Sequence, residues 1–264
     1  MPDGICGTHP TSGDFDRVIT GDALLRYEGV DVGVYVNLGK SLVRPVRSVA
    51  TGTKYDSTSR TSGLPTQSSV FGALPRNPLR VDYCRFSRKS SNERDHFRDA
   101  FRFAETVDEL YRAHLPGPYK LHRELVDSRV HKDWRAGDYP FTTCNFNVNH
   151  AIRYHRDSGN FKGVFSNVLV LRDSCSGGEL VFPEFRVALA QSDAALCLID
   201  GQKWTHGVMP IKRHTAKAYR ASIVYYALER MADCYPYKEE RARFSKVRTK
   251  RARSRAGGNE AIKK

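Results

Sequence analysis

Apolar residues along the chain follow two different periods, and the change between them falls near residue 141. Between residues 92 and 114, apolar side chains recur mostly at steps of three or four, which gives one apolar face and predicts an amphipathic helix. The segment Pro116-Gly117-Pro118 ends this helix, and a second helix is expected from 119 to 130. The residues of the apolar face are Phe97, Phe101, Ala104, Val107, Leu110 and Tyr111.

From Phe141 onward the apolar period becomes two, which is typical of strands. Turn signals such as Cys175-Ser176-Gly177-Gly178 and Asp200-Gly201 separate the apolar runs. Helices followed by a series of short strands predict an α+β protein with a β-sandwich or barrel core. The predicted strands lie within 141–157, 166–173, 178–185, 187–200 and 218–228.

The first part of the chain carries weaker signals. Residues 30–38 form an apolar patch that predicts a strand, whereas 51–69 are rich in Ser, Thr and Gly and predict a long loop. We therefore expect three parts: an N-terminal extension and loop at 1–59, a main domain at 60–235 with its strand core from about 141, and a basic, disordered tail at 236–264.

Composition limits the class of protein. With 264 residues, 40% hydrophobic and 11% aromatic, the chain can bury one large core. No apolar run approaches the roughly 18 residues of a membrane span, and the first residues, MPDGICGTHPTSGD, do not resemble a secretory signal. The six cysteines are scattered without a C-x-x-C pair, so we expect reduced thiols in a cytosol-like compartment.

Charge points to a polyanionic partner. The net charge is +14, and residues 238–264 hold eleven Lys/Arg against three acidic residues. Such a tail is either a solvated extension that aids solubility or an arm that binds a phosphate backbone. Because the rest of the chain is also basic, the second interpretation, nucleic-acid binding, is favoured.

The first predicted strand carries a row of hydrogen-bonding groups on one face. Alternate residues of a strand share a face, and three asparagines there indicate the lining of a polar pocket. The row ends in an imidazole and a carboxylate side by side, His155 and Asp157. Its members are Asn145, Asn147, Asn149, Ala151, Arg153, His155 and Asp157.

A third ligand and an anion anchor follow downstream. His206 comes after an apolar strand and a turn, and two histidines with one carboxylate form the facial triad that holds non-haem Fe(II) with open positions. Arg220 and Ser222 share a strand face and suit capture of a carboxylate such as that of 2-oxoglutarate. Taken singly, each residue has an ordinary structural explanation; the shared order and spacing favour a site.

The order of these motifs resembles that of Fe(II)- and 2-oxoglutarate-dependent dioxygenases, and more narrowly the TET/JBP family, which hydroxylates the 5-methyl group of pyrimidines in DNA. The resemblance is carried by 145–163, 176–189, 200–211 and 219–226, and extends to 68–85, where Arg76, Arg80 and Asp82 have no assigned role. It implies a double-stranded β-helix (jelly-roll, cupin-like) core with flanking N-terminal helices, so that 60–235 would be the dioxygenase domain. The compact chain and basic tail are most similar to small phage-encoded members, which act in the host cytoplasm.

The resemblance also implies residue roles. His155, Asp157 and His206 would bind Fe(II) as the catalytic centre, and Arg220 with Ser222 would hold 2-oxoglutarate while O₂ binds the metal. Three asparagines, Asn145, Asn147 and Asn160, have two open interpretations: contact with substrate or co-substrate, or internal hydrogen bonds that shape the pocket. The resemblance places Asn160 at the flipped base, and Asn145 and Asn147 at the co-substrate or base.

One departure from the family pattern leaves the substrate open. Eight residues after the anchoring arginine, where animal members have a base-contacting histidine, this chain has Leu228. The expected activity is hydroxylation of 5-methylcytosine in duplex DNA by a monomeric enzyme that flips the base, with thymine in DNA as the alternative. An oxygenase of RNA or protein, and a non-catalytic DNA-binding jelly roll, remain further alternatives that the core motifs alone do not separate.

Overall fold

A large antiparallel sheet forms the centre of the molecule. The computed structural model describes residues 4–59, 65–77 and 81–261. The sheet contains nine strands, with β6 (Arg85–Phe86) pairing at the end of β5. The other eight follow in spatial order: β2 (Ala23–Tyr27), β3 (Val30–Asn37), β12 (Ala195–Ile199), β8 (Ser166–Asp173), β15 (Tyr219–Tyr226), β7 (Thr143–Val148), β5 (Pro65–Leu74) and β4 (Asp56–Ser59).

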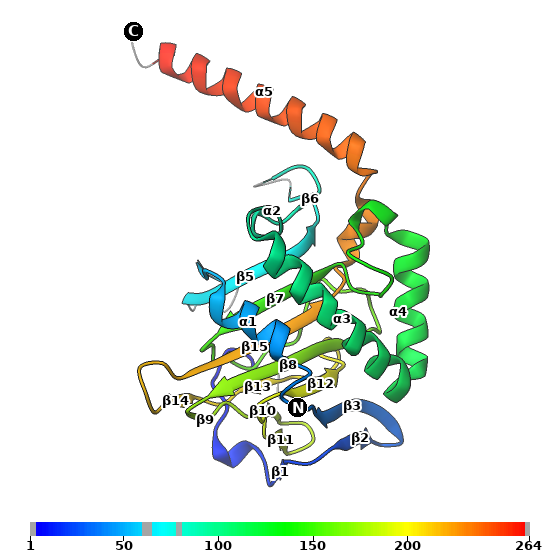
Figure 1. Cartoon of the computed structure of the whole chain (residues 1–264), viewed down its shortest axis with the longest axis vertical. Coiled ribbons are helices and arrows are strands. Elements are labelled where there is room, and N and C mark those ends of the chain that lie inside the picture. The colour runs from blue at the N-terminus through cyan, green and yellow to red at the C-terminus, as the bar shows by residue number, and fades with distance from the viewer. Residues whose placement is uncertain (1–3, 60–64, 78–80, 262–264) are drawn as a thin grey trace.

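A smaller sheet packs against one face of this large sheet (Figure 1). Side chains from the two sheets share one buried apolar cluster, which includes Tyr35 and Cys197 of the large sheet and Phe182 and Val208 of the small one. Two facing sheets, antiparallel except for the parallel pair β1 and β11, surround a shared core; this agrees with a double-stranded β-helix and confirms the predicted fold class. The small sheet contains β1 (Arg17–Ile19), β11 (Val187–Leu189), β10 (Leu180–Phe182) and β13 (Gly207–Val208), and β9 (Cys175–Gly177) pairs separately with β14 (Ile211–Arg213).

Helices cover the other face of the large sheet. The predicted apolar stripe lies on α3, and Phe101, Ala104, Val107 and Tyr111 are buried against strand residues such as Phe146. A proline at the first helical position begins the next helix, α4, directly after α3. The helices of the body are α1 (Arg44–Gly52), α2 (Arg88–Asn92), α3 (Arg94–His114) and α4 (Pro116–Arg129), with short 3₁₀ turns η1 (Ser12–Asp14), η2 (Lys132–Trp134) and η3 (Glu229–Asp233).

Two expectations for the first third of the chain were wrong. The described parts of 51–69, predicted as a loop, form the end of α1, strand β4 and the start of β5, while 60–64 lie outside the described residues. Strand β5 pairs with β4 and β7, so it is an interior strand of the sheet, and polar residues such as Ser68 and Ser69 are buried on it; Ser69 Oγ donates to the Lys54 carbonyl at 2.9 Å. Residues 1–59 are also no separate extension, since β2 and β3 continue the large sheet.

The strand that leads to the metal ligands is shorter than the alternation suggested. Strand β7 ends at Val148, and Asn149 takes a left-handed conformation with φ of 51°. Its side chain accepts a hydrogen bond from the Arg220 backbone N–H at 2.9 Å. Asparagine tolerates this conformation better than most residues, so the chain leaves the sheet here and reaches His155 and Asp157 as a loop.

The cysteine expectation needs a correction as well. Cys84 and Cys234 form a disulfide that closes a sequence separation of 150 residues, whereas Cys144 and Cys197 are free and buried. The pairing was not readable from sequence because the two positions are brought together only by the tertiary fold.

The basic tail is helical rather than disordered. Helix α5 spans Tyr237–Ala261 and extends away from the body (Figure 1). Within the described residues, no helix combines the length and apolar character needed to cross a membrane.

Candidate active site

Three side chains that can bind a metal converge between the two sheets. The backbones of His155 and His206 pair in both directions, each N–H donating to the other's carbonyl at 3.0 Å. The Asp157 N–H donates to the Gly201 carbonyl at 2.8 Å. These bonds place one ligand atom of each of the three side chains within 4.8 Å of the others. The structure thus brings together the residues that the H-x-D motif and the downstream histidine predicted.

Backbone carbonyls orient both imidazoles. Nδ1 of His155 lies 2.9 Å from the Arg153 carbonyl, and Nδ1 of His206 lies 3.0 Å from the Trp204 carbonyl. A carbonyl only accepts, so each Nδ1 carries the proton and each Nε2 keeps its lone pair. The Nε2 atoms lie 3.5 and 3.8 Å from Asp157 Oδ1. This second layer of hydrogen bonds is the one that metal-binding histidines usually have.

The charge state of the three groups suits a divalent cation. Burial alone would raise the pKa of the Asp157 carboxyl, but the imidazoles of His155 and His206 hold it well below its ordinary value. A metal ion between Oδ1 and the Nε2 atoms would stabilise the carboxylate in the same way. Burial lowers the pKa of His206, which favours the neutral, ligating imidazole. The set of two nitrogens and one carboxylate oxygen fits the facial triad of Fe(II).

A serine and an asparagine hold the carboxylate from behind. Ser166 Oγ donates to Asp157 Oδ2 at 2.9 Å, and Asn160 Nδ2 donates to Ser166 Oγ at 3.3 Å. The Asn160 carbonyl in turn accepts from Gln202 Nε2 at 2.8 Å. Sequence reasoning missed Ser166, since a serine at the start of an apolar strand gives no signal of this role.

Glycine at position 201 is required by the ligand beside it. A Cβ at this position would lie 2.4 Å from Asp157 Oδ2 and 3.1 Å from His206 Cε1. We therefore expect Gly201→Ala to displace the carboxylate and to weaken Fe(II) binding roughly 10- to 100-fold, the range found when groups that support metal ligands are altered. Titration with Fe(II) or Co(II) under anaerobic conditions measures this. Gly117→Ala is the matched control, because no atom lies within 4 Å of its added Cβ; equal metal affinity in both variants would contradict the assignment.

The cavity beside the ligands contains a buried cation without an acidic partner. Arg220 is only 2% exposed, and its Nε has no hydrogen-bond partner among the described residues. Burial, together with the nearby Arg172, lowers the pKa of its guanidinium to about 10. A buried unpaired charge is costly, and an anion bound in the cavity would offset that cost. Ser222 lies two residues along β15 and lines the same cavity.

The cavity of about 100 Å³ joins this cation to the metal ligands. Its walls are apolar around a few convergent polar groups, which is the usual character of a small-molecule site. The lining residues are Asn147, His150, Ile152, His155, Asp157, Val168, Leu180, Gln191, Ile199, His206, Val208, Arg220, Ser222 and Val224. Gln191 is a member that the sequence did not reveal.

The predicted glycine-rich hairpin positions the cation. Gly178 has φ of 79°, and a Cβ there would lie 2.8 Å from Arg220 Cδ. A Cβ on Gly177, at φ of 72°, would lie 2.1 Å from the Pro210 carbonyl oxygen. The two glycines therefore let the hairpin pass directly over the guanidinium.

The two asparagines of β7 take different positions. Asn147 lines the cavity, whereas Asn145 is buried and donates from Nδ2 to Asn147 Oδ1 at 3.3 Å. Asn160 is 9% exposed and lies behind the metal ligand. The predicted substrate contacts of these residues thus stay predictions, while internal hydrogen bonds are present at Asn145 and Asn160.

The chain is similar to known oxygenases. A model of the Tet_JBP family, the oxygenase domain of the 2OGFeDO superfamily, matches residues 73–229. The bifunctional helicase and thymine dioxygenase JBP2 of Trypanosoma brucei brucei is 25% identical over 122 residues, which span 46% of this chain and 11% of JBP2. The structure of NgTET1 in complex with 5mC DNA is 14% identical with a TM-score of 0.59, covering 83% of this chain and 85% of NgTET1. The chain thus matches about a tenth of the length of JBP2, and the likeness to NgTET1 shows a shared fold.

Proposed function

The chain belongs to the Tet_JBP family of Fe(II)- and 2-oxoglutarate-dependent oxygenases, and from this premise we propose that it hydroxylates the 5-methyl group of 5-methylcytosine in DNA. The observation that carries the proposal is the buried, unpaired guanidinium of Arg220 in the same cavity as the triad of His155, Asp157 and His206. A structural arginine has its donors satisfied, as Arg172 has by backbone carbonyls, whereas an anchor for a co-substrate carboxylate must be free to bind it.

Fe(II) and 2-oxoglutarate fit the residues present. The triad offers two imidazole nitrogens and one carboxylate oxygen to the metal, and Arg220 with Ser222 offers donors to the far carboxylate of 2-oxoglutarate. When bound, the iron and its co-substrate supply the oxidant: O₂ gives one oxygen atom to succinate as CO₂ leaves, and the other atom enters a C–H bond of the methyl group.

The protein's own residues position the reactants and exclude water. Arg220 would hold one end of the co-substrate in the cavity that the triad also lines. Apolar walls, including Ile152, Val168 and Leu180, keep bulk water from the reacting atoms. Ser166 holds Asp157 Oδ2 and leaves Oδ1 directed at the metal position.

We propose that the base is flipped out of the duplex. The side chains of His155 and Asp157 are about 30% exposed and that of His206 only 7%, so the ligands are recessed and a base stacked in duplex DNA would not bring its methyl group to them. Extrusion costs a few kcal/mol, which phosphate contacts and pocket hydrogen bonds offset. The loop that carries Asn160 and pairs with Leu228 lies beside Asp157 and is the proposed place of base contact.

Thymine is the second candidate substrate. JBP2, the relative in sequence, is a thymine dioxygenase, and Leu228 replaces the histidine that the family resemblance places at the base. An apolar side chain there offers no hydrogen bond by which cytosine could be preferred over thymine.

Nucleoside mass spectrometry separates these possibilities. Purified protein is incubated with Fe(II), 2-oxoglutarate, ascorbate and duplex DNA that contains both thymine and 5-methylcytosine, beside single-stranded DNA and RNA of the same sequence. We expect one oxygen to be gained by 5-methylcytosine in the DNA. A gain on thymine alone would move the activity to that base. Consumption of 2-oxoglutarate with no change in any DNA base would overturn the proposal and direct attention to RNA or protein.

A further inference from the structure

Helix α5 is attached to the body through a buried carboxylate. Glu240, in the first turns of α5, is 1% exposed, and its Oε1 accepts from Arg76 Nη2 at 2.7 Å and from the Tyr235 N–H at 3.1 Å. Its Oε2 accepts from the Cys84 N–H at 2.9 Å. A buried carboxylate with these donors and a paired guanidinium is fully compensated, so the base of α5 has one defined position.

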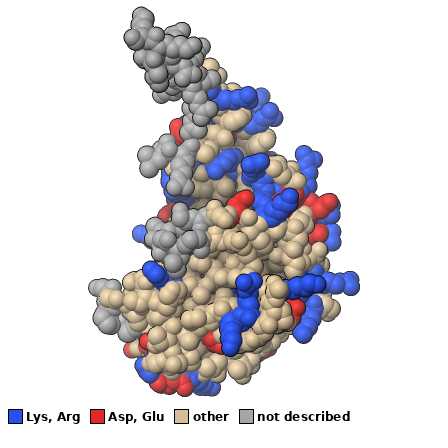
Figure 2. Space-filling model, turned by 90° about the vertical axis from the view of Figure 1, so that its left-hand side faces the viewer, with Lys and Arg blue, Asp and Glu red and all other residues tan. Residues whose placement is uncertain are grey.

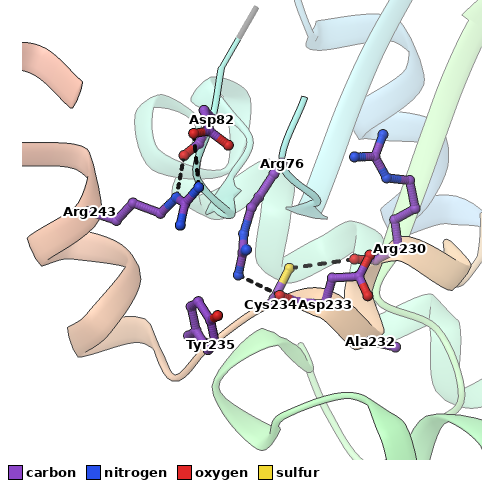
Figure 3. Close-up of a pocket in the computed structure, with 8 residues that line it drawn as sticks. All are labelled: Arg76, Asp82, Arg230, Ala232, Asp233, Cys234, Tyr235 and Arg243. Atoms are coloured by element: carbon purple, nitrogen blue, oxygen red, sulfur yellow. Dashed lines mark hydrogen bonds and ion pairs between the residues drawn. The ribbon is translucent and has the colours of Figure 1, made fainter. Parts of the chain in front are cut away.

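Further contacts fix the direction of the helix. Arg243 donates from Nη2 to Asp82 Oδ2 at 2.8 Å and from Nε to the Asp82 carbonyl at 2.7 Å (Figure 3). The rings of Tyr83 and Phe244 meet with centroids 4.9 Å apart. The disulfide between residues 84 and 234 links the same two segments. We call these contacts the joint; they account for Arg76 and Asp82 of the motif at 68–85, whereas Arg80 lies outside the described residues.

Beyond the joint, α5 is unsupported by the body. Most described side chains from Arg241 to Thr249 are exposed, and the helix points outward (Figure 1). Its large apolar residues with described exposure are Tyr237 at 44% and Phe244 at 37%, and their rings meet Trp134 and Tyr83 of the body at the base of the helix. A helix that is polar all round has no apolar face with which to pack against the body or to lie on a membrane surface.

The charge of α5 calls for an external counter-charge. Its sequence holds nine Lys/Arg and three acidic residues, and two of the acidic residues, Glu239 and Glu240, lie in the first turn. Like charges recur four residues apart, as at 246 and 250 or 251 and 255, which destabilises an isolated helix. Figure 2 shows Lys and Arg side chains on the described part of α5 and on the body beneath it. A polyanion along the helix would remove this repulsion.

The joint also lies close to the catalytic loop. Strand β15, which carries Arg220, leads through Leu228 and η3 directly into Cys234 and α5. Leu228 pairs with Asn160, and the Glu229 N–H donates to the Gly159 carbonyl at 2.8 Å. A polyanion bound along α5 is therefore held in a fixed relation to the loop that follows Asp157.

A hollow at the foot of α5 adds to the basic surface. Its volume is about 590 Å³, and Arg76, Arg230 and Arg243 line it together with Asp82 and Asp233 (Figure 3). Arg76 and Arg243 are already paired with Glu240 and Asp82, so the cation that the hollow adds is Arg230, which is exposed without an ion pair to a described residue. The surface thus continues from the helix onto the body.

We propose that α5 is an arm that binds the phosphate backbone of duplex DNA outside the base pocket, oriented by the joint. The inference rests on the proposed function in so far as the partner is the DNA substrate. Its chemistry is charge with little apolar surface: the sequence of the helix carries nine Lys/Arg over 25 residues, about 37 Å at 1.5 Å per residue, and Lys238, Lys246 and Arg248 are exposed to meet a regular row of phosphates. Binding is expected to be independent of base sequence.

The test compares two triple variants with equal loss of charge. Lys238→Gln with Lys246→Gln and Arg248→Gln removes exposed cations of α5, none of which forms an ion pair with a described residue. The control, Lys212→Gln with Arg213→Gln and Lys217→Gln, removes exposed cations of β14 and the turn after it, at the opposite end of the molecule (Figure 1).

Affinity for an unmethylated duplex of about 30 base pairs is measured by fluorescence anisotropy over a series of salt concentrations, with 2-oxoglutarate turnover in the absence of DNA as the check on folding. We expect the α5 variant to bind DNA at least about tenfold more weakly than the parent protein. The magnitude of the slope of log K against log salt should fall by up to about 2.7, which is about 0.9 for each of the three phosphate contacts removed. The control variant should stay within about twofold of the parent protein.

An equal loss of DNA affinity in both variants, or no loss in either, would overturn the proposal that α5 binds DNA. Dependence on α5 for vesicles of anionic phospholipid but not for duplex DNA would overturn it as well. This outcome is separate from that of the proposed function. DNA binding that depends on α5, without oxidation of any base, would support the DNA-binding role of α5 and contradict the proposed function. Base oxidation with DNA binding that does not depend on α5 would support the proposed function and contradict the role of α5.

Discussion

Replacing Asp157 by alanine is expected to abolish Fe(II) binding and all 2-oxoglutarate turnover. The substitution removes the only carboxylate among the three clustered ligands and leaves the two imidazoles of His155 and His206 with Nε2 atoms that share no anionic partner. Loss of a group that merely supports a ligand weakens metal binding about 10- to 100-fold, so loss of the ligand itself should exceed about 100-fold. Anaerobic Fe(II) titration and succinate formation measure both effects.

Asp95→Ala is the control for this change, because its side chain is 82% exposed in the first turn of α3 and pairs with Arg98. Thermal unfolding of both variants checks that the fold is kept. Succinate formation by the Asp157→Ala variant at the parent rate would refute the ligand assignment.

Replacing Arg220 by alanine should raise the requirement for 2-oxoglutarate and leave Fe(II) binding intact. Removing one partner of a buried charge pair costs about 2–5 kcal/mol, and each 1.4 kcal/mol is about tenfold, so the KM for 2-oxoglutarate should rise at least about 30-fold. Arg220→Lys keeps the charge but not the bidentate geometry and should give an intermediate value.

Stability provides an independent check on this role. The Arg220 guanidinium has no acidic partner in the described structure, so its removal should not lower the free energy of unfolding of the protein without co-substrate, and can raise it. A marked loss of stability with an unchanged KM for 2-oxoglutarate would show that Arg220 is structural and that the anchor lies elsewhere.

The sequence predicted those parts of the molecule that depend on local patterns. The stripe from Phe97 to Tyr111 predicted α3, and alternation predicted β8 and β15, because burial of one face imposes the period of the element. The triad was found for a similar reason: His155 and Asp157 are neighbours in sequence, and His206 follows a strand end.

Features that depend on distant contacts could not be predicted in this way. Arg76 and Glu240 are 164 residues apart, and nothing in either segment announces the other. Strand β5 has polar residues at buried positions, such as Ser69, whose Oγ donates to the Lys54 carbonyl, and hydropathy does not record such a contact. The role of Gly201 follows from the 2.4 Å that would separate an added Cβ from Asp157 Oδ2, a proximity that the sequence does not show.

The most direct test of the central claim is incorporation of oxygen from ¹⁸O₂ by the full chain with Fe(II), 2-oxoglutarate and duplex DNA containing 5-methylcytosine and thymine. We predict one ¹⁸O atom in succinate and one in the hydroxymethyl group of a DNA pyrimidine, in equal amounts, with neither label formed by the Asp157→Ala variant. Label in succinate with none in any DNA base, or labelled base from the Asp157→Ala variant, would contradict it.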